Sequence, residues 1–186
     1  MAYVLAGLFK GMRLTVPSRI RATEAKVRLA LFNILQAVTK GARVLDGCAG
    51  SGALGLEALS REAASAVFVE SEPACVRAIQ DNLARALDKG LQAPTQVMRT
   101  DVIQGLRTLA RRGAVFDLIL LDPPYSRDVG KKALNVVAEC AMLAPVGILC
   151  LEHAVRDAVP SEAGSLTLAK QHRYGGTVLS FYLQHS

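Results

Sequence analysis

Hydrophobic and polar positions along the chain change their period several times, and each period predicts one kind of element. From Thr23 to Gly41 the apolar residues recur at helical spacing, and Thr23 can cap this helix while Gly41 can end it. Further on, short, largely apolar segments predict strands at residues 43–46, 66–70, 95–98, 117–121 and 147–151, and an alternating pattern predicts strands at residues 166–174 and 177–183. Amphipathic stretches between them predict helices at residues 53–60, 103–111 and 131–142, and one that begins at Pro73.

The order of these elements indicates an α/β fold. Apolar strands that alternate with helices are typical of a parallel sheet covered on both faces. The last two strands follow each other directly, and Gly175-Gly176 between them predicts a hairpin with an antiparallel strand. We therefore expect a doubly wound, mostly parallel seven-stranded sheet closed by a C-terminal antiparallel hairpin.

Length and composition are those of one globular domain. The chain has 186 residues, of which 51% are hydrophobic and 20% charged. No run of about 18 uncharged apolar residues occurs, so no membrane span is expected. The first nine residues lack the basic start and the cleavage site of a signal peptide, which predicts a cytoplasmic protein.

The cysteines and histidines predict no metal site. The four cysteines form no C-x-x-C pair, and none lies at ligand spacing from a histidine, so we expect reduced thiols. His153, His172 and His185 are expected on the surface or in structural roles rather than in catalysis.

The net charge of +6 is concentrated at the N-terminus. Residues 1–40 hold seven Lys and Arg side chains against one Glu, whereas the rest of the chain holds 15 of each sign. The chain therefore divides into a basic N-terminal extension, residues 1–40, and a neutral body, residues 41–186. Such an extension is either a solvated surface or a surface that contacts phosphates. The candidate phosphate contacts are Lys10, Arg13, Arg19, Arg21 and Arg28.

A glycine-rich turn follows the first predicted strand of the body. It runs from Asp46 to Gly52, with the spacing D-x-x-x-G-x-G, and glycine lets its backbone turn sharply and approach a ligand. The dinucleotide pattern G-x-G-x-x-G differs, because there a helix terminus binds a pyrophosphate. An acid at the strand end suits a cation instead, such as the ammonium of a methionine moiety. The candidate ligand-binding residues are Asp46, Cys48, Ala49, Gly50, Ser51 and Gly52, with Cys48 as a packing residue and not a nucleophile.

Two further acids lie at or just after the ends of predicted strands. Glu70 lies 24 residues after Asp46, where an acid in this class of fold accepts hydrogen bonds from both ribose hydroxyls. Glu72 is a competitor in the following turn, and either acid could instead be merely solvated. Asp101, with the amide of Val102 beside it, is a candidate for binding the amino group of adenine, or alternatively for capping a helix.

The sequence Asp122-Pro123-Pro124-Tyr125, directly after an apolar strand, suits chemistry on an exocyclic amine. The lone pair of such an amine is delocalised into the base, so acceptors must hold its hydrogens while it attacks. Asp122 and the carbonyl of Pro123 can accept them, and neither proline has an N–H that would compete for the lone pair. Tyr125 supplies a flat face for an unstacked base. Catalysis of this kind is mainly positioning, and it needs neither a metal nor a covalent intermediate.

These motifs resemble, in order and spacing, those of the RsmD-type 16S ribosomal RNA guanine-N2 methyltransferases, which have a Rossmann-like fold. The resemblance is carried by residues 11–14, 21–23, 27–28, 31–33, 45–61, 67–70, 122–125 and 174–180. It implies that S-adenosylmethionine binds at Asp46, Gly50, Gly52 and Glu70. It also implies that residues 122–125 cover the target amine and that the basic extension binds ribosomal RNA, within an assembled small-subunit particle. A monomer is the default expectation.

Two alternatives remain open at this point. The D-P-P-Y motif serves an N6-adenine methyltransferase on DNA or RNA equally well, although the chain is too compact for a separate target-recognition domain. A non-catalytic RNA-binding factor of ribosome assembly could keep the same fold, although the intact Asp122 argues against it.

Overall fold

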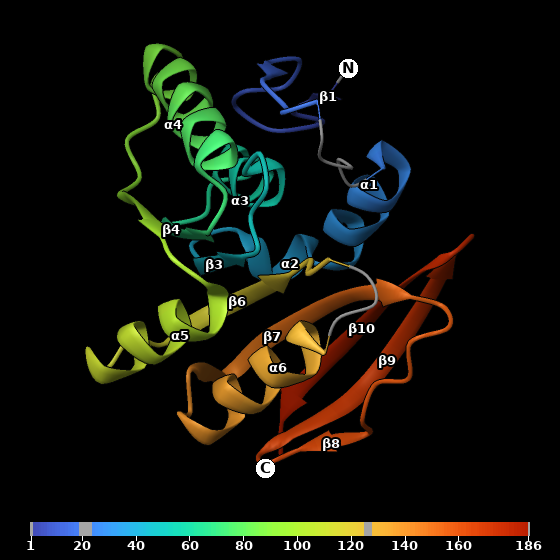
Figure 1. The fold of residues 1–186 in the computed structure, drawn as a ribbon. Helices are drawn as coiled ribbons and strands as arrows, with labels where there is room; N and C mark the ends of the chain where they lie inside the picture. The colour runs from blue at the N-terminus through green and yellow to red at the C-terminus, as the bar shows by residue number, and fades with distance from the viewer. Residues whose placement is uncertain (1, 19–23, 125–127, 186) are drawn as a thin grey trace.

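The computed structural model describes residues 2–18, 24–124 and 128–185, which form one eight-stranded sheet, a separate two-stranded sheet and the helices around them (Figure 1). The small sheet pairs β1 (Ala2–Tyr3) with β2 (Arg13–Leu14). The strands of the large sheet are β3 (Arg43–Gly47), β4 (Ser65–Glu70), β5 (Thr95–Arg99), β6 (Phe116–Leu121), β7 (Leu143–Ala154), β8 (Glu162–Ala163), β9 (Leu166–Tyr174) and β10 (Thr177–Gln184). The helices are α1 (Ala25–Ile34), α2 (Gln36–Thr39), α3 (Ala53–Ser60), α4 (Pro73–Asp88), α5 (Val102–Arg111) and α6 (Val129–Glu139).

The large sheet confirms the predicted fold. Its order is β5-β4-β3-β6-β7-β10-β9-β8, and the strands from β5 to β7 are parallel. The hairpin of β9 and β10 is antiparallel, and β10 inserts between β7 and β9. The prediction of seven strands omitted β8, a two-residue strand at the edge that pairs with Leu166 and Thr167. Two residues are too few to show a period in the sequence.

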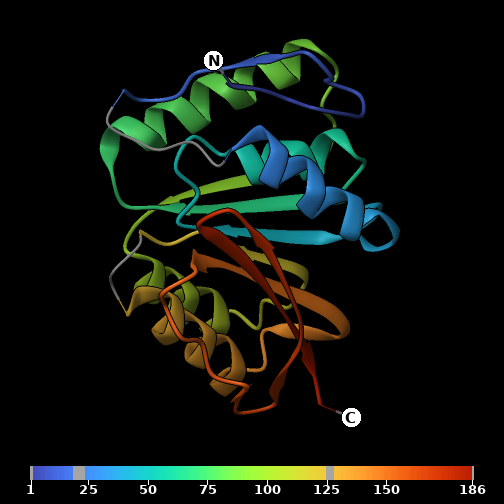
Figure 2. The same ribbon diagram turned by 90° about the vertical axis from the view of Figure 1, so that its right-hand side faces the viewer.

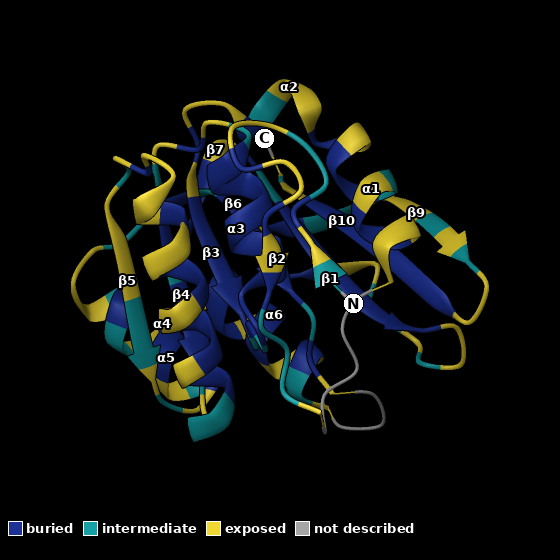
Figure 3. Cartoon of the chain, turned by 90° about the horizontal axis from the view of Figure 1, so that it is seen from above, coloured by how far each residue is buried: buried dark blue, intermediate teal, exposed yellow. Residues whose placement is uncertain are grey.

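The two faces of the sheet carry separate apolar layers. One layer contains α1, α3, α4 and the N-terminal segments, and the other contains α5 and α6 (Figures 1 and 2). Side chains alternate between these layers along each strand, as in β6, where Leu118 and Leu120 join the first layer and Ile119 and Leu121 the second. Figure 3 shows the resulting burial of the central strands, with exposed positions concentrated on the edges and outer helices.

Two predicted helices have different bounds in the structure. The helix expected from Thr23 to Gly41 is divided into α1 and α2 at Leu35, which has φ −85° and ψ 5°, and Thr23 lies outside the described residues. The helix expected to reach Met142 ends at Glu139, because Ala141 adopts a left-handed φ of 48°. The N–H of Met142 then donates to the carbonyl of Val137, which satisfies the helix end.

The N-terminal segments lie against α3 and α4 rather than apart from the body. Leu8 N–H donates to the carbonyl of Ser60 in α3, and Thr15 N–H donates to Oδ1 of Asn82 in α4. Val4 and Phe9 are buried in the same apolar layer as α3. None of the helices in the described part of the chain is both long and apolar enough to cross a membrane.

Candidate active site at the carboxyl edge of the sheet

A cleft of about 1020 Å³ opens at the carboxyl ends of the parallel strands. Strand alternation places Asp46, Asp122 and Glu152 on the face of the sheet that carries α3, one residue beyond Leu45, Leu121 and Leu151 of the opposite layer. Together with Glu70 at the end of β4, they form a group that we call the edge acids: Asp46, Glu70, Asp122 and Glu152. Among the described residues that line this cleft there is no Lys, Arg or His, so the cleft is acidic.

The glycine-rich turn brings backbone to the floor of this cleft. Gly52 precedes α3 with a left-handed φ of 76°, which glycine adopts without strain. Gly47 lies so close to β6 that a Cβ there would be 2.6 Å from Cδ2 of Leu121. Ala49, Gly50 and Ser51 line the cleft, as the sequence predicted for ligand-binding residues, while Gly52 itself packs behind them.

Cys48 lines the cleft with a left-handed φ of 62°. Burial, followed by the nearby carboxylates of Glu70 and Asp122, raises the pKa of its thiol far above the ordinary value. A thiol that stays protonated is a poor nucleophile. This environment is in line with the packing role expected for Cys48.

Asp46 is buried at the centre of the site, and its Oδ2 accepts a hydrogen bond of 2.8 Å from Gly55 N–H in α3. Burial raises the pKa of Asp46 to about 8, the hydrogen bond from Gly55 opposes this rise, and the charges of Asp122 and Glu70 add to it. A cation beside this carboxyl would favour its ionised form and lower the pKa. The site is therefore electrostatically suited to a positively charged ligand.

Glu70 bonds to the glycine-rich turn, whereas its predicted competitor does not. Oε2 of Glu70 accepts from Gly50 N–H at 2.7 Å, and Oε1 accepts from Glu72 N–H at 2.8 Å. Glu72 is exposed at the start of α4 and lines the outer part of the cleft. The geometry thus favours Glu70 over Glu72 as the acid beside the turn.

Asp101 caps a helix, and its position is also compatible with the other role that the sequence left open. Its Oδ1 accepts from Ile103 N–H at 2.9 Å and from Gln104 N–H at 3.4 Å, so it caps α5. It also lines the cleft, with Val102 beside it. A capping bond through one oxygen is compatible with ligand binding through the other.

The Asp122-Pro123-Pro124 segment forms one wall of the cleft. Asp122 N–H donates to the carbonyl of Gly47 at 3.3 Å, which ties the segment to the end of β3. Tyr125 lies outside the described residues. A smaller cavity of about 260 Å³ adjoins this wall, and both cavities are lined by Pro123, Pro124 and Glu152.

The prediction that Arg28 contacts phosphate is wrong, because its side chain is only 1% exposed. Its Nε lies 3.9 Å from Oε2 of Glu57, and its guanidinium donates to the carbonyl of Tyr3. Burial lowers the pKa of Arg28, and the charge of Glu57 partly opposes this. Arg28 therefore makes contacts inside the protein and is not accessible to a phosphate group in solvent.

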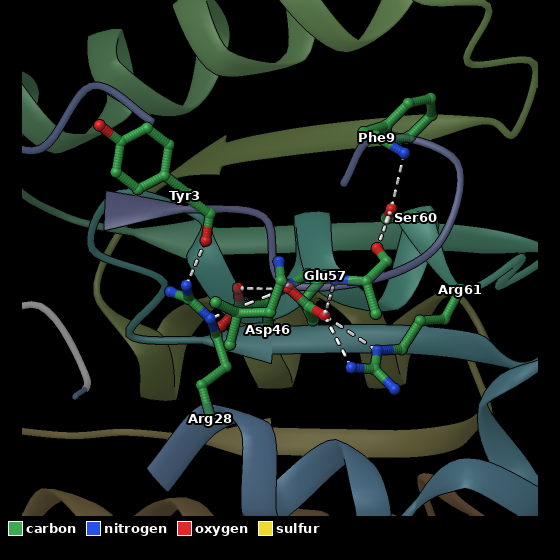
Figure 4. A network of polar contacts seen from close by, with 10 residues as sticks. Tyr3, Phe9, Arg28, Asp46, Glu57, Ser60 and Arg61 are labelled. Carbon is green, nitrogen blue, oxygen red and sulfur yellow. Dashed lines mark hydrogen bonds and ion pairs between the residues drawn. The ribbon is translucent and has the colours of Figure 1, made fainter. Parts of the chain in front are cut away.

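Glu57 joins the N-terminal segments to α3, a role that the sequence analysis did not assign (Figure 4). It is fully buried and accepts hydrogen bonds from Leu5 N–H at 2.7 Å and Ala6 N–H at 3.1 Å. Arg61 donates to it from Nε at 2.9 Å. We call Arg28, Glu57 and Arg61 the anchor cluster. The signal in the sequence is a single acid in the otherwise uncharged segment Ala53–Ser60. The structure shows that all eight residues of this helix are buried.

The other predicted phosphate contacts differ in what the structure shows. Lys10 and Arg13 are exposed, whereas Arg19 and Arg21 lie outside the described residues. A hollow of about 1320 Å³ beside Arg13 is also lined by Arg85 and Lys89 of the α4 end. Arg85 Nη1 donates to the carbonyl of Arg13 at 3.3 Å. Arg85 and Lys89 were not predicted as phosphate contacts, because residues 41–186 carry no net charge.

The histidines and cysteines show no further chemistry. His153 is buried, with Nε2 at 2.7 Å from Oγ of Ser180 and Nδ1 at 2.9 Å from the carbonyl of Ala154. The four cysteines are free thiols. Over the described ranges, no group of three or more His, Cys, Asp or Glu side chains is arranged to hold a metal ion.

Comparison with known proteins gives a consistent result. Residues 2–183 match the family described as Conserved hypothetical protein 95. The ribosomal RNA small subunit methyltransferase D of Escherichia coli K12 is 30% identical over 181 residues, which cover 96% of this chain and 88% of that protein. The solved structure of a hypothetical protein from Thermus thermophilus is 29% identical with a TM-score of 0.84, and the match covers 99% of both chains.

A more distant solved structure shares the fold. It is the Thermus thermophilus 16S rRNA N2 G1207 methyltransferase RsmC in complex with AdoMet and guanosine, which is 24% identical. Its TM-score is 0.70, and the match covers 96% of this chain and 46% of that chain.

Proposed function

Since this chain belongs to the family described as Conserved hypothetical protein 95, we propose that it transfers a methyl group from S-adenosylmethionine to the N2 amine of a guanine in 16S ribosomal RNA. The resemblance to RsmD-type enzymes, first inferred from the motifs, is confirmed by this membership and by the relative in Escherichia coli. The observation that carries the proposal is the position of Asp122-Pro123-Pro124 on the wall of an acid-lined cleft.

The residues of the cleft fit the proposed methyl donor. S-adenosylmethionine carries an ammonium, a sulfonium and two ribose hydroxyls, and the cleft offers carboxylates with no competing cation among its described residues. Asp46 and the turn at residues 48–52 would hold the methionine part, Glu70 the ribose, and Asp101 with Val102 the adenine. The volume of about 1020 Å³ is at the upper end of the usual range for small-molecule sites.

The protein's own contribution to the reaction is to position the target amine. When bound, S-adenosylmethionine supplies an electrophilic methyl group, which the amine nitrogen takes while the carbon–sulfur bonding pair stays on sulfur. Asp122 accepts one amine hydrogen and takes up the proton that the nitrogen must lose, and the carbonyl of Pro123 accepts the other hydrogen. Pro124 adds no N–H, so the amine lone pair stays free to react. Tyr125 supplies the surface on which the unstacked base lies.

The division of the chain follows from the same proposal. Residues 1–40 form the basic extension that contacts RNA through Lys10, Arg13, Arg19 and Arg21, and residues 41–186 carry the reaction. The name of the relative in Escherichia coli supports the small ribosomal subunit as the source of this RNA. The resemblance to RsmD-type enzymes favours guanine N2 over adenine N6. The enzyme acts as a cytoplasmic monomer on RNA within an assembled small-subunit particle.

Nucleoside mass spectrometry tests the proposal. Purified protein is incubated with labelled S-adenosylmethionine and small-subunit particles from a strain that lacks the gene. We expect labelled N2-methylguanosine, its loss in Asp122→Asn, and its retention in Asp81→Asn, which changes an exposed acid on α4. N6-methyladenosine would instead favour the adenine alternative. Donor binding without any methylation of particles or naked RNA would favour a non-catalytic assembly factor.

A further inference from the structure

We propose that Glu152 selects guanine, by accepting a hydrogen bond from N1–H of the target base while Asp122 holds the N2 amine beside it. This inference rests on the proposed function and adds a specificity-determining residue to it. The sequence motifs do not include Glu152, because it lies inside the long strand β7.

The sheet places Glu152 beside Asp122. Strands β6 and β7 are parallel neighbours, and Leu121 is in register with Leu151. Asp122 and Glu152 each follow these leucines, so both point to the face that carries α3. Adjacent strands lie about 4.7–4.9 Å apart, which allows two carboxylates to contact neighbouring atoms of one small ligand.

The cavities meet at the same place. Glu152, Pro123 and Pro124 line both the cleft assigned to the methyl donor and the adjoining cavity of about 260 Å³. At about 30 Å³ per water molecule, that cavity has room for roughly nine waters, which is enough space for one heterocyclic base. A base in this cavity would present its edge to Asp122 and Glu152, with its amine toward the donor cleft.

Among the polar groups of the smaller cavity, Glu152 is best suited to read the base. It is 6% exposed and is the acid that lines both the cleft and the smaller cavity, whereas His153 lines the smaller cavity alone. The other buried polar side chain there, His153, has both ring nitrogens engaged by Ser180 and the carbonyl of Ala154. On the rim, Lys131 and Arg156 are balanced by Asp128 and Asp157.

The two purines differ at the atom that Glu152 would contact. Guanine carries a donor at N1 beside the N2 amine, whereas adenine carries an acceptor at N1 beside the N6 amine. A pair of carboxylates therefore matches guanine at both atoms and repels the N1 lone pair of adenine. Discrimination of this kind is strong, because a site built for a hydrogen bond leaves a buried polar group unpaired with the wrong substrate.

A base analogue separates recognition from chemistry. 2-Aminopurine keeps the amine at position 2 but has an unprotonated N1. It replaces the guanine at the position where the wild-type protein forms N2-methylguanosine, and kcat/KM is measured for both RNAs. We expect the wild type to prefer guanine by about 100-fold or more. In Glu152→Gln the amide can donate to N1 of 2-aminopurine, so the preference should fall at least about tenfold.

Each outcome decides the proposal. Equal rates on both RNAs by the wild type would overturn it, even if Glu152→Gln proved too unstable to assay. An unchanged preference in a folded Glu152→Gln, or an equal loss on both RNAs, would assign Glu152 a structural role only. In both cases N2-methylguanosine formation would leave the proposed function standing, whereas N6-methyladenosine would overturn both. Donor affinity and thermal unfolding monitor folding, and Glu162→Gln, an exposed acid of β8, is the matched control.

Discussion

The anchor cluster and the edge acids are two groups of charged side chains on the same face of the sheet, and they differ in the source of their counter-charge. Glu57 has Arg28 and Arg61 beside it, and two backbone N–H groups complete its hydrogen bonds. Asp46, at the centre of the edge acids, has one backbone donor from α3 and further carboxylates nearby.

This difference separates structure from function. When all partners of a buried charge belong to the protein itself, the charge is compensated as soon as the chain folds. Removing one partner then leaves the other charge uncompensated. A cluster of like charges is unfavourable until a ligand of opposite charge arrives, and such arrangements are typical of functional sites. We therefore expect the first group to control stability and the second to control ligand affinity and rate.

The largest expected effect is on the anchor cluster. Glu57→Ala removes the acceptor of Leu5 and Ala6 N–H and leaves Arg28 buried without its counter-charge. We expect a loss of about 3–5 kcal/mol in the free energy of unfolding. Urea denaturation measures it, with Glu62→Ala, whose ion pair with Lys40 is exposed, as the control. A loss below about 1 kcal/mol would mean that the two clusters do not differ in this way.

Asp122 should show the opposite pattern. Asp122→Ala is expected to lower kcat by about 10²–10³-fold, because the amine loses its acceptor, while the unfolding free energy stays within about 1 kcal/mol. Single-turnover kinetics and urea denaturation measure the two quantities on the same preparation. A variant that unfolds easily but keeps its rate would place Asp122 with the anchor cluster.

The pH dependence of donor binding sharpens the comparison further. Below about pH 8 the carboxyl of Asp46 is mostly protonated, so binding a cation requires loss of a proton. Affinity for S-adenosylmethionine should therefore rise roughly 50-fold between about pH 6 and pH 8 and level off above about pH 9. Isothermal titration calorimetry in buffers of different ionisation enthalpy detects the released proton. In Asp46→Asn the affinity should be lower and independent of pH in this range.

The same raised pKa affects the stability of the ligand-free protein. The unfolded chain loses the proton of Asp46 near pH 4, whereas the folded chain keeps it up to about pH 8. The folded state thus binds more protons between these values, so this residue makes stability fall as pH rises. Asp46→Asn should remove that part of the fall.

The smallest effects are expected for the exposed cations. Lys10→Gln and Arg13→Gln should each weaken RNA binding about two- to fivefold and lower the slope of log affinity against log salt by about one. Filter binding at several salt concentrations measures both, and Arg111→Gln on the opposite layer is the control. A salt-independent affinity would show that the N-terminal surface does not contact phosphates.

The fold could be predicted from sequence because its strands carry strong local signals. The apolar run at residues 117–121 and the alternating pattern at residues 166–174 correspond closely to β6 and β9, and Gly175-Gly176 lies at the turn. The end of α6 could not be predicted, because Ala141 takes the left-handed position that usually belongs to glycine.

The site was predicted unevenly for a similar reason. Asp46 and Glu70 lie at the ends of strands and belong to motifs, so their place at the sheet edge could be inferred. Arg28 was wrongly predicted because its charge was counted without regard to helical periodicity. Arg28 shares the spacing of one buried helix face with Leu31, Phe32 and Leu35. Glu152 carries no motif, and only the register of β6 and β7 brings it next to Asp122.

The attachment of the N-terminal segments to α3 and α4 also constrains the order in which the molecule can assemble during translation. Leu5 and Leu8 bond to residues 57 and 60, and Thr15 bonds to residue 82. A ribosome releases the chain from its N-terminus onward. Residues 5–15 must therefore wait for between 52 and 67 later residues before they can form these bonds, so this surface cannot become ordered before α3 and α4 are made.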